Sequence, residues 1–204
     1  MIDLARIEEA LRCRLDDERL RHTRGVVDAA VAMARRWGAD PEKARLAALL
    51  HDYAKGLPPE RLLELGRRFG VIADPAEEAF PDLLHAPVGA ELVREEGLAR
   101  DPEVLAAIRW HTTGTPGMGL LEKVIWLADM IEPGRDFPGV EILRRLAERD
   151  LDEALLAGLD HTIAYVLRTG RLLHLGSVRT RNWLLAERRR AGKPWPVPAV
   201  SSAW

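Results

Sequence analysis

The sequence predicts an all-α fold, and three features of its pattern lead to that class. Apolar residues recur every three to four positions along most of the 204 residues. Alanine, leucine, arginine and glutamate are abundant, whereas runs of β-branched residues are scarce. Prolines and glycines stand between the periodic segments, where helices begin and end. No strand-like alternation competes with this pattern, so we expect about ten helices.

The expected helices follow one another with short connections. Two Asp-Pro pairs, Asp40-Pro41 and Asp101-Pro102, each place an N-cap before a proline at the first helical position. Glycines follow other periodic segments, where helix C-terminal caps belong: Gly38, Gly56, Gly70, Gly97 and Gly170. The expected helices cover residues 3–16, 19–37, 41–54, 59–69, 82–96, 101–111, 118–131, 138–148, 151–169 and 177–190.

The chain length fits one domain, which we place at residues 1–190 because no linker or internal repeat divides it. The Pro-rich end, residues 191–204, is expected to be a flexible tail. The alternative is that Trp195 or Trp204 docks on this subunit or on another one.

Composition excludes several classes of protein. The formal net charge of −2, with both signs spread along the chain, argues against a duplex nucleic acid partner. The single cysteine, Cys13, excludes a disulfide framework within one chain and a thiolate zinc finger. The first twenty residues carry charges throughout, and no apolar run is long enough to span a bilayer. We therefore expect a cytoplasmic protein without a membrane partner; a homodimer is compatible with the sequence.

Six ionisable side chains fall where the core is expected. Four histidines lie on the apolar faces of their helices: His22, His51, His85 and His111. Asp129 ends the apolar stretch LLEKVIWLAD, and Asp52 follows His51 in LAALLHDYAKGLP. One such histidine is usually satisfied within the core, but six of these groups would each cost several kcal/mol if unpaired. A shared metal centre satisfies them together, and imidazole with carboxylate suits iron, manganese, zinc or cobalt.

The order of these six residues resembles the HD-domain superfamily of metal-dependent phosphohydrolases. Further motifs resemble its YqeK family over about residues 15–190. They are RHTRGV at 21–26, HDYAKGLP at 51–58, HAPVGA at 85–90, RWHTTG at 109–114, LADMIEPGRDFPGV at 127–140, DLDEAL at 150–155 and TRNWLL at 180–185. The resemblance implies an HD-domain helical bundle that splits diadenosine tetraphosphate symmetrically into two ADP at an iron-bearing dinuclear site. Manganese and cobalt accept the same ligands. The Pro-rich tail and Leu175 depart from the family pattern.

The resemblance also implies roles for the six residues. His22, His51, Asp52 and Asp129 would hold the first metal, and His85 and His111 the second, with Asp52 bridging. A carboxylate has two oxygens and can span metals roughly 3.5–4 Å apart, which a neutral imidazole cannot do. A metal-activated hydroxide would then attack an inner phosphate, and the residues taken as catalytic are Asp52, Lys55 and Asp129.

A polyphosphate substrate needs further contacts. Lys55 and Arg135 lie within a few residues of a predicted ligand and are candidates to bind phosphate, although an isolated Lys or Arg is usually a solvated charge. Gly25, one turn from His22, either admits phosphate to the backbone or serves helix packing. The loop and helix at HLGSVRTRN add three candidates to bind phosphate or nucleoside: His174, Arg181 and Asn182.

Three functions remain open at this point. The first is symmetrical hydrolysis of dinucleoside polyphosphates. The second is another HD-type activity, such as a nucleotidase, a deoxynucleotide triphosphohydrolase or a phosphodiesterase, because these share the metal chemistry. The third is a nucleotide-binding sensor without turnover. A P-loop NTPase and a serine hydrolase are excluded, since neither the Walker A pattern nor GxSxG is present.

Overall fold

A computed structural model describes residues 4–193, which form eleven α-helices and one 3-10 helix without any strand. The expected all-α class is therefore confirmed. In chain order the elements are α1 Leu4–Arg12, α2 Asp17–Trp37, α3 Pro41–Leu50, α4 Pro59–Phe69, α5 Pro75–Ala79, η1 Pro81–Leu84, α6 His85–Glu95, α7 Pro102–Trp110, α8 Leu120–Ile131, α9 Val140–Ala147, α10 Leu151–Arg168 and α11 Leu175–Arg190. Most of the expected tail, from residue 194 on and including Trp195 and Trp204, lies outside the described residues.

Each of the ten expected helices is present, and the capping signals explain many of the ends. Asp40 accepts hydrogen bonds from the backbone of the first turn of α3, and Asp101 does the same for α7. Helix α5 was missed because one turn is too short to show a periodicity. It depends instead on a capping box. The side chain of Asp74 accepts a hydrogen bond from the backbone of the first turn, and the side chain of Glu77 accepts one from the backbone N–H of Asp74.

Gly56 is not the helix cap that the sequence predicts. Four of the five expected capping glycines have positive φ, as a C-terminal cap requires. Gly56 does not, because α3 already ends at Leu50 and turns lead through residues 51–57. A Cβ at Gly56 would overlap the carbonyl oxygen of Arg14. This glycine therefore allows close approach of the loop after α1.

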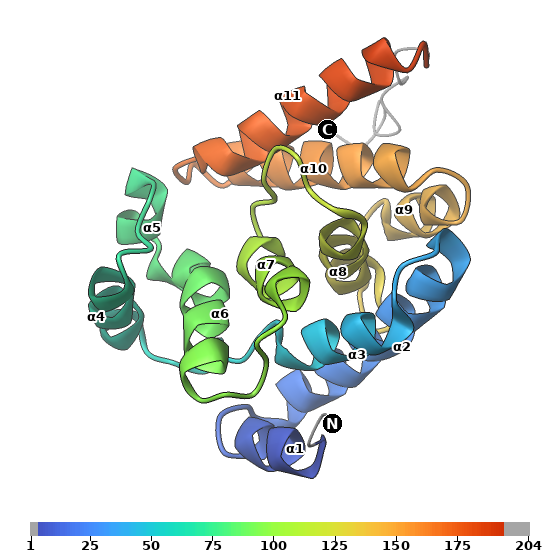
Figure 1. The fold of residues 1–204 in the computed structure, drawn as a ribbon. Coiled ribbons are helices and arrows are strands. Elements are labelled where there is room, and N and C mark those ends of the chain that lie inside the picture. Colours follow the sequence, from blue (N-terminus) through green and yellow to red (C-terminus); the bar gives the residue numbers. More distant parts are fainter. Residues whose placement is uncertain (1–3, 194–204) are drawn as a thin grey trace.

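Helix α8 lies in the middle of the molecule (Figure 1) and packs against α2, α3, α7, α9 and α10. Its apolar residues explain this place, since Val124, Ile125 and Leu127 are fully buried. Helices α4, α5 and α6 lie on one side of α7 and α8, whereas α2 and α3 lie on another, and α11 covers α10. Within residues 4–193, no helix combines the length and the apolar character needed to cross a lipid bilayer.

This packing directs several helix ends toward one region. His51 follows the last residue of α3, His111 follows the last residue of α7, and His85 stands where η1 passes into α6. Asp129 lies in the last turn of the central helix α8. Only His22 comes from within a helix, in the first third of α2.

Candidate metal centre

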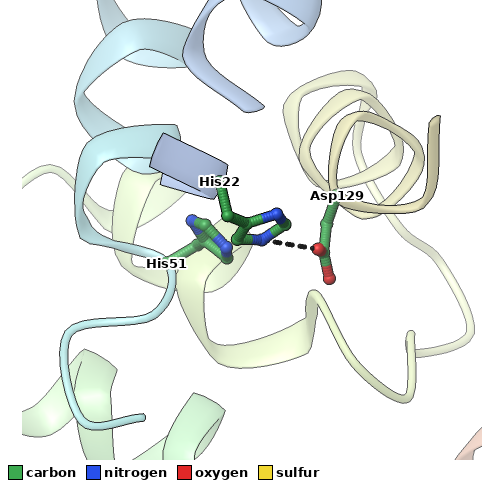
Figure 2. A group of neighbouring side chains, drawn as sticks. All are labelled: His22, His51 and Asp129. Atoms are coloured by element: carbon green, nitrogen blue, oxygen red, sulfur yellow. Dashed lines mark ion pairs between the residues drawn. The ribbon is translucent and has the colours of Figure 1, made fainter. Parts of the chain in front are cut away.

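Three of the predicted ligands form one compact group, shown in Figure 2. One ligand atom from each of His22, His51 and Asp129 lies within 4.8 Å of the others. The closest pair is His22 Nε2 and Asp129 Oδ1, at 3.1 Å. His51 is fully buried, and the side chains of His22 and Asp129 are 10% and 18% exposed. The group is nearly closed to water, yet one edge remains open.

Asp52 lies between this group and a second pair of histidines. Its Oδ2 is 3.5 Å from His51 Nε2 and 3.8 Å from His22 Nε2. Its Oδ1 is 3.3 Å from His85 Nε2 and 3.8 Å from His111 Nε2. The two oxygens of one buried carboxylate are thus divided between two pairs of imidazoles. The structure brings all six predicted ligands together, although their roles remain predictions.

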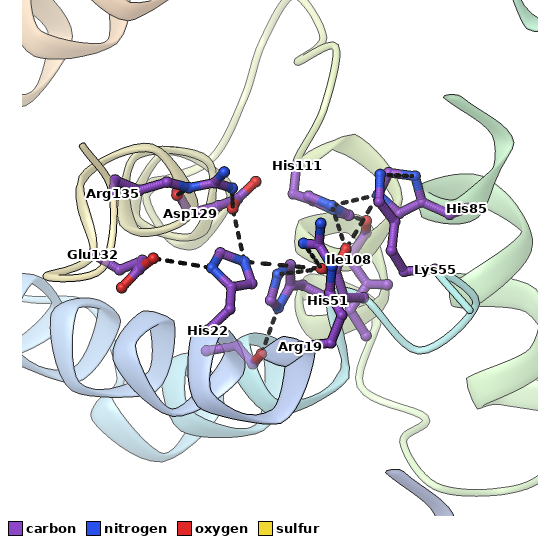
Figure 3. A network of polar contacts seen from close by, with 12 residues as sticks. Arg19, His22, His51, Lys55, His85, Ile108, His111, Asp129, Glu132 and Arg135 are labelled. Carbon is purple, nitrogen blue, oxygen red and sulfur yellow. Dashed lines mark hydrogen bonds and ion pairs between the residues drawn. The ribbon is translucent and has the colours of Figure 1, made fainter. Parts of the chain in front are cut away.

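In all four imidazoles Nδ1 faces an oxygen acceptor, as Figure 3 shows for part of the network. In three of them Nδ1 faces a backbone carbonyl three residues earlier: Ala48 for His51, Asp82 for His85 and Ile108 for His111. In His22, Nδ1 faces Glu132 Oε1 at 3.1 Å. A carbonyl or carboxylate only accepts, so Nδ1 carries a proton in each ring. Both nitrogens of His22 lie 3.1 Å from a carboxylate oxygen, but only the Nδ1 contact has the geometry of a hydrogen bond. In the neutral form of each ring, Nε2 is then left with a lone pair directed at the cluster.

The surroundings of the four Nε2 atoms show whether a metal fits this site. The buried Nε2 atoms of His22 and His51 have no hydrogen-bond partner, although carboxylate oxygens lie within ion-pair distance of both. The Nε2 atoms of His85 and His111 approach each other at 3.1 Å. Two lone pairs at that distance repel, and buried acceptors without donors are costly. A divalent cation satisfies both needs, so the residues present can hold a metal.

The electrostatics of the cluster agree with this. Burial disfavours ionisation of Asp52 and Asp129, but neighbouring histidines, together with Arg135 for Asp129, hold the pKa of both carboxyls well below the usual range. Burial alone would lower the pKa of His51, yet the two carboxylates raise it to about 9. Burial, together with the charge that His51 and His85 carry when protonated, lowers the pKa of His111 to about 3. The two carboxylates thus attract positive charge to His51, whether that charge is a second proton on the ring or a bound cation.

Three cationic side chains surround the cluster. Arg19 Nη1 lies 3.2 Å from Asp52 Oδ2, and Arg135 forms an ion pair with Asp129. Lys55 Nζ lies 2.8 Å from Asp82 Oδ2, next to His85. Arg19 and Arg135 also line a cleft of about 540 Å³, together with His22, Gly25 and Glu132. This cleft leads to the edge of the cluster, and acidic side chains also line it, at Glu18, Asp28 and Glu132.

Sequence reasoning missed two of these residues. Arg19 is one turn before His22 on the same helix, and that spacing was the signal that could have found it. Glu132 lies three residues after Asp129, on the IEPG segment, but its contact with His22 spans 110 residues and has no local signature. Gly25, a predicted phosphate site, faces Glu132 so closely that a Cβ would overlap the carboxylate.

The three candidates on the loop and helix around α11 make contacts elsewhere. His174 caps α11, where its Nδ1 accepts a hydrogen bond from Gly176 N at 2.9 Å. Its Nε2 faces Glu77 Oε1 at 3.4 Å, which connects α11 to α5. Arg181 forms an ion pair with Asp160, and Asn182 is exposed. None of these contacts involves one of the six clustered histidines and aspartates. Substrate binding by His174, Arg181 and Asn182 therefore stays a prediction.

Comparisons with known proteins agree with the geometry. Residues 19–134, which include all six clustered residues, match the HD domain family. A protein of Bacillus subtilis named symmetrical bis(5'-nucleosyl)-tetraphosphatase is 44% identical over 182 residues, 88% of this chain and 97% of that protein. A Halalkalibacterium halodurans protein of the same name is 43% identical, over 89% and 96% of the two chains. A crystal structure from Clostridium acetobutylicum, described as a predicted HD superfamily hydrolase involved in NAD metabolism, is similar with a TM-score of 0.88 and 41% identity, over 92% of this chain and 99% of that one.

Replacing His174 with alanine should destabilise the protein and leave its metal content unchanged. The substitution removes the acceptor for Gly176 N and the partner of Glu77, and loss of a helix cap costs about 0.5–2 kcal/mol. The free energy of unfolding in urea and the metal bound per chain are the two measurements. Unchanged stability with a raised KM for nucleotide would instead support substrate binding by His174.

Proposed function

The chain belongs to the HD domain family and, within it, to the family of symmetrical bis(5'-nucleosyl)-tetraphosphatases, and from that premise we propose that it hydrolyses dinucleoside polyphosphates symmetrically. Diadenosine tetraphosphate and water would yield two ADP. The observation that carries the proposal is the cluster in which Asp52 stands between two histidine pairs, inside the region that matches the HD domain.

We propose two metal sites that share Asp52. His22, His51 and Asp129 would hold the first metal together with Asp52, and His85 and His111 would hold the second, also with Asp52. The division of distances supports this count, because each oxygen has its own pair of imidazoles within 3.8 Å. Iron is the proposed metal, with manganese or cobalt as substitutes that accept the same nitrogen and oxygen ligands.

When bound, such metals supply Lewis acidity that activates water near neutral pH and offsets charge on phosphoryl oxygens. The residues of the protein orient the ligand atoms and provide the negative charge that balances a bound cation. Asp52 and Asp129 hold their negative charge in a buried site because cationic neighbours keep their pKa values low. The imidazoles keep their lone pairs on one side because their Nδ1 protons are engaged on the other. Symmetrical cleavage requires attack at an inner phosphate, with ADP leaving.

Three cations are the proposed contacts for the polyphosphate. Lys55 and Arg135 were expected from the sequence, and Arg19 joins them because it lines the same cleft as Arg135 and reaches Asp52. Each forms an ion pair next to a proposed metal ligand, and each side chain is partly exposed, at 20% for Lys55 and about a third for the two arginines. Guanidinium groups suit phosphate because they donate two parallel hydrogen bonds.

The proposal also covers the partners, the location and the oligomeric state of the enzyme. Its partners would be the dinucleoside polyphosphate and the ADP product, with no duplex nucleic acid and no membrane. A cytoplasmic location and a homodimer are part of the same proposal. The near-neutral net charge of −2 supports the absence of duplex nucleic acid, and the single cysteine supports the cytoplasmic location.

Product analysis tests the reaction. Purified protein with Fe²⁺, Mn²⁺ or Co²⁺ should convert diadenosine tetraphosphate to ADP alone, as measured by anion-exchange separation of the products. AMP with ATP would contradict symmetrical cleavage. Hydrolysis only of mononucleotides, deoxynucleotide triphosphates or cyclic nucleotides would favour another HD activity, and nucleotide binding without turnover with any of the three metals would favour a sensor.

Replacing Asp52 with alanine should lower turnover by more than about 100-fold, because the substitution removes a ligand from both proposed sites. Loss of a residue that only supports a metal ligand already lowers activity or metal affinity about 10–100-fold. Metal analysis should show two metals per chain in the unchanged protein, fewer than one in Asp52→Ala, and one in His85→Ala, which serves as the matched variant. Two metals retained in His85→Ala would contradict the dinuclear assignment.

Replacing Lys55 with alanine should raise the KM or lower the kcat for diadenosine tetraphosphate about 10- to 150-fold, since one charge-assisted hydrogen bond contributes about 1.5–3 kcal/mol. Metal content should stay normal. Asp82→Ala is the control, because it breaks the same ion pair but keeps the cation. Equal losses in both variants, or loss of metal in Lys55→Ala, would assign Lys55 a structural role.

A further inference from the structure

Glu132 is a buried carboxylate that contacts His22 on the side of the ring turned away from the cluster. The residue is 4% exposed, and its Oε1 lies 3.1 Å from His22 Nδ1, the nitrogen opposite the one that faces Asp52 and Asp129. In Figure 3 the side chains of Glu132 and Asp129 approach the two sides of the His22 ring. A buried charge without a purpose is costly, so this placement needs a physical explanation.

His22 differs from the other three histidines in what orients it. His51 and His111 follow the ends of α3 and α7, where helix carbonyls lack intrahelical partners and can accept from Nδ1. His22 lies within α2, where the preceding carbonyls are engaged in the helix. A side chain from another element must therefore hold its Nδ1 proton, and Glu132 does so.

The backbone around Glu132 is shaped to admit its carboxylate. A Cβ at Gly25 would overlap Oε2, and a Cβ at Gly134 would lie 3.0 Å from both oxygens. Gly134 N also donates a hydrogen bond to Oε2 at 2.5 Å. Gly25 thus leaves room for a carboxylate that a Cβ would displace, and Gly134 allows its backbone to approach the carboxylate closely.

The loop that carries Glu132 is itself fixed. Arg144, on α9, donates to three carbonyl oxygens: Ile131 at 3.0 Å, Glu132 at 2.8 Å and Arg135 at 3.0 Å. Together they span the chain on both sides of Glu132. The carboxylate is therefore delivered to His22 by a backbone held in place at several points.

From this geometry we propose that Glu132 is the positioning residue of His22. It holds the ring in the Nδ1–H tautomer and directs the Nε2 lone pair toward the space beside Asp52 and Asp129, while its charge favours a cation bound there. Gly25 serves the same purpose by leaving room for the carboxylate. The inference rests on the metal-binding part of the proposed function, and it does not depend on which nucleotide is cleaved.

The test measures the affinity of the full chain for Co²⁺ without nucleotide, by competition with a chelator. Glu132→Ala should bind Co²⁺ 10–100-fold more weakly at the first site, because supporting partners of metal ligands have effects of that size. Glu132→Gln, which keeps an acceptor oxygen, should lose less. Gly25→Ala should weaken binding like Glu132→Ala, since its methyl group displaces the carboxylate.

The double variant Gly25→Ala/Glu132→Ala makes the test sharper. If Gly25 acts only through Glu132, the double variant should bind Co²⁺ no more weakly than Glu132→Ala alone. The matched control is Glu77→Gln, because Glu77 is also a buried carboxylate that faces a histidine, His174, outside the cluster. Its affinity for Co²⁺ should remain unchanged.

A second readout reports the tautomer itself. In the metal-free protein, nitrogen-15 NMR of His22 should show the proton on Nδ1, and Glu132→Ala should lose that preference. Wild-type affinity in Glu132→Ala, or additive losses in the double variant, would overturn the inference. If the affinities follow the predicted pattern but diadenosine tetraphosphate is not cleaved, the inference stands and the proposed substrate is wrong.

Discussion

The structure depends on the convergence of four imidazole lone pairs and two carboxylates in one nearly dry space. While the rings are neutral, neither group can satisfy the other, because the lone pairs and the carboxylate oxygens are all acceptors. Asp52 is central, since its two oxygens face different histidine pairs at 3.3–3.8 Å. A positive charge between them resolves the conflict, which explains why the fold maintains an arrangement that would otherwise be strongly destabilising.

Helix ends solve the geometric part of this problem. A carbonyl left free at the end of a helix holds the Nδ1 proton of a histidine three residues later, and the ring then points beyond the helix. The central helix α8 sets the position of these ends, because α2, α3 and α7 all pack on it. The apolar core thus determines where the ligands meet, and orientation at His22 requires the side chain of Glu132.

The sequence predicted most of the fold and the membership of the cluster, because both have local signatures. Periodicity and caps locate ten helices, and a histidine on an apolar face is visible in one turn. What the sequence did not indicate has no such signature. Helix α5 is a single turn, Gly56 makes room for a carbonyl 42 residues away, and the partners of Glu132 and Arg19 lie 110 and 33 residues away.

Charge compensation links the metal cluster to the proposed substrate. Arg19 and Arg135 form ion pairs with the carboxylates of Asp52 and Asp129, and a cation on those carboxylates competes for the same oxygens. The guanidinium groups then have donors to spare for another anion, and they line the cleft that leads to the cluster. A chain of phosphates supplies several negative oxygens along a line, so it could contact the proposed metals and both arginines at once. A ligand with a single phosphate would leave part of this positive charge uncompensated, which is a physical reason to favour a polyphosphate.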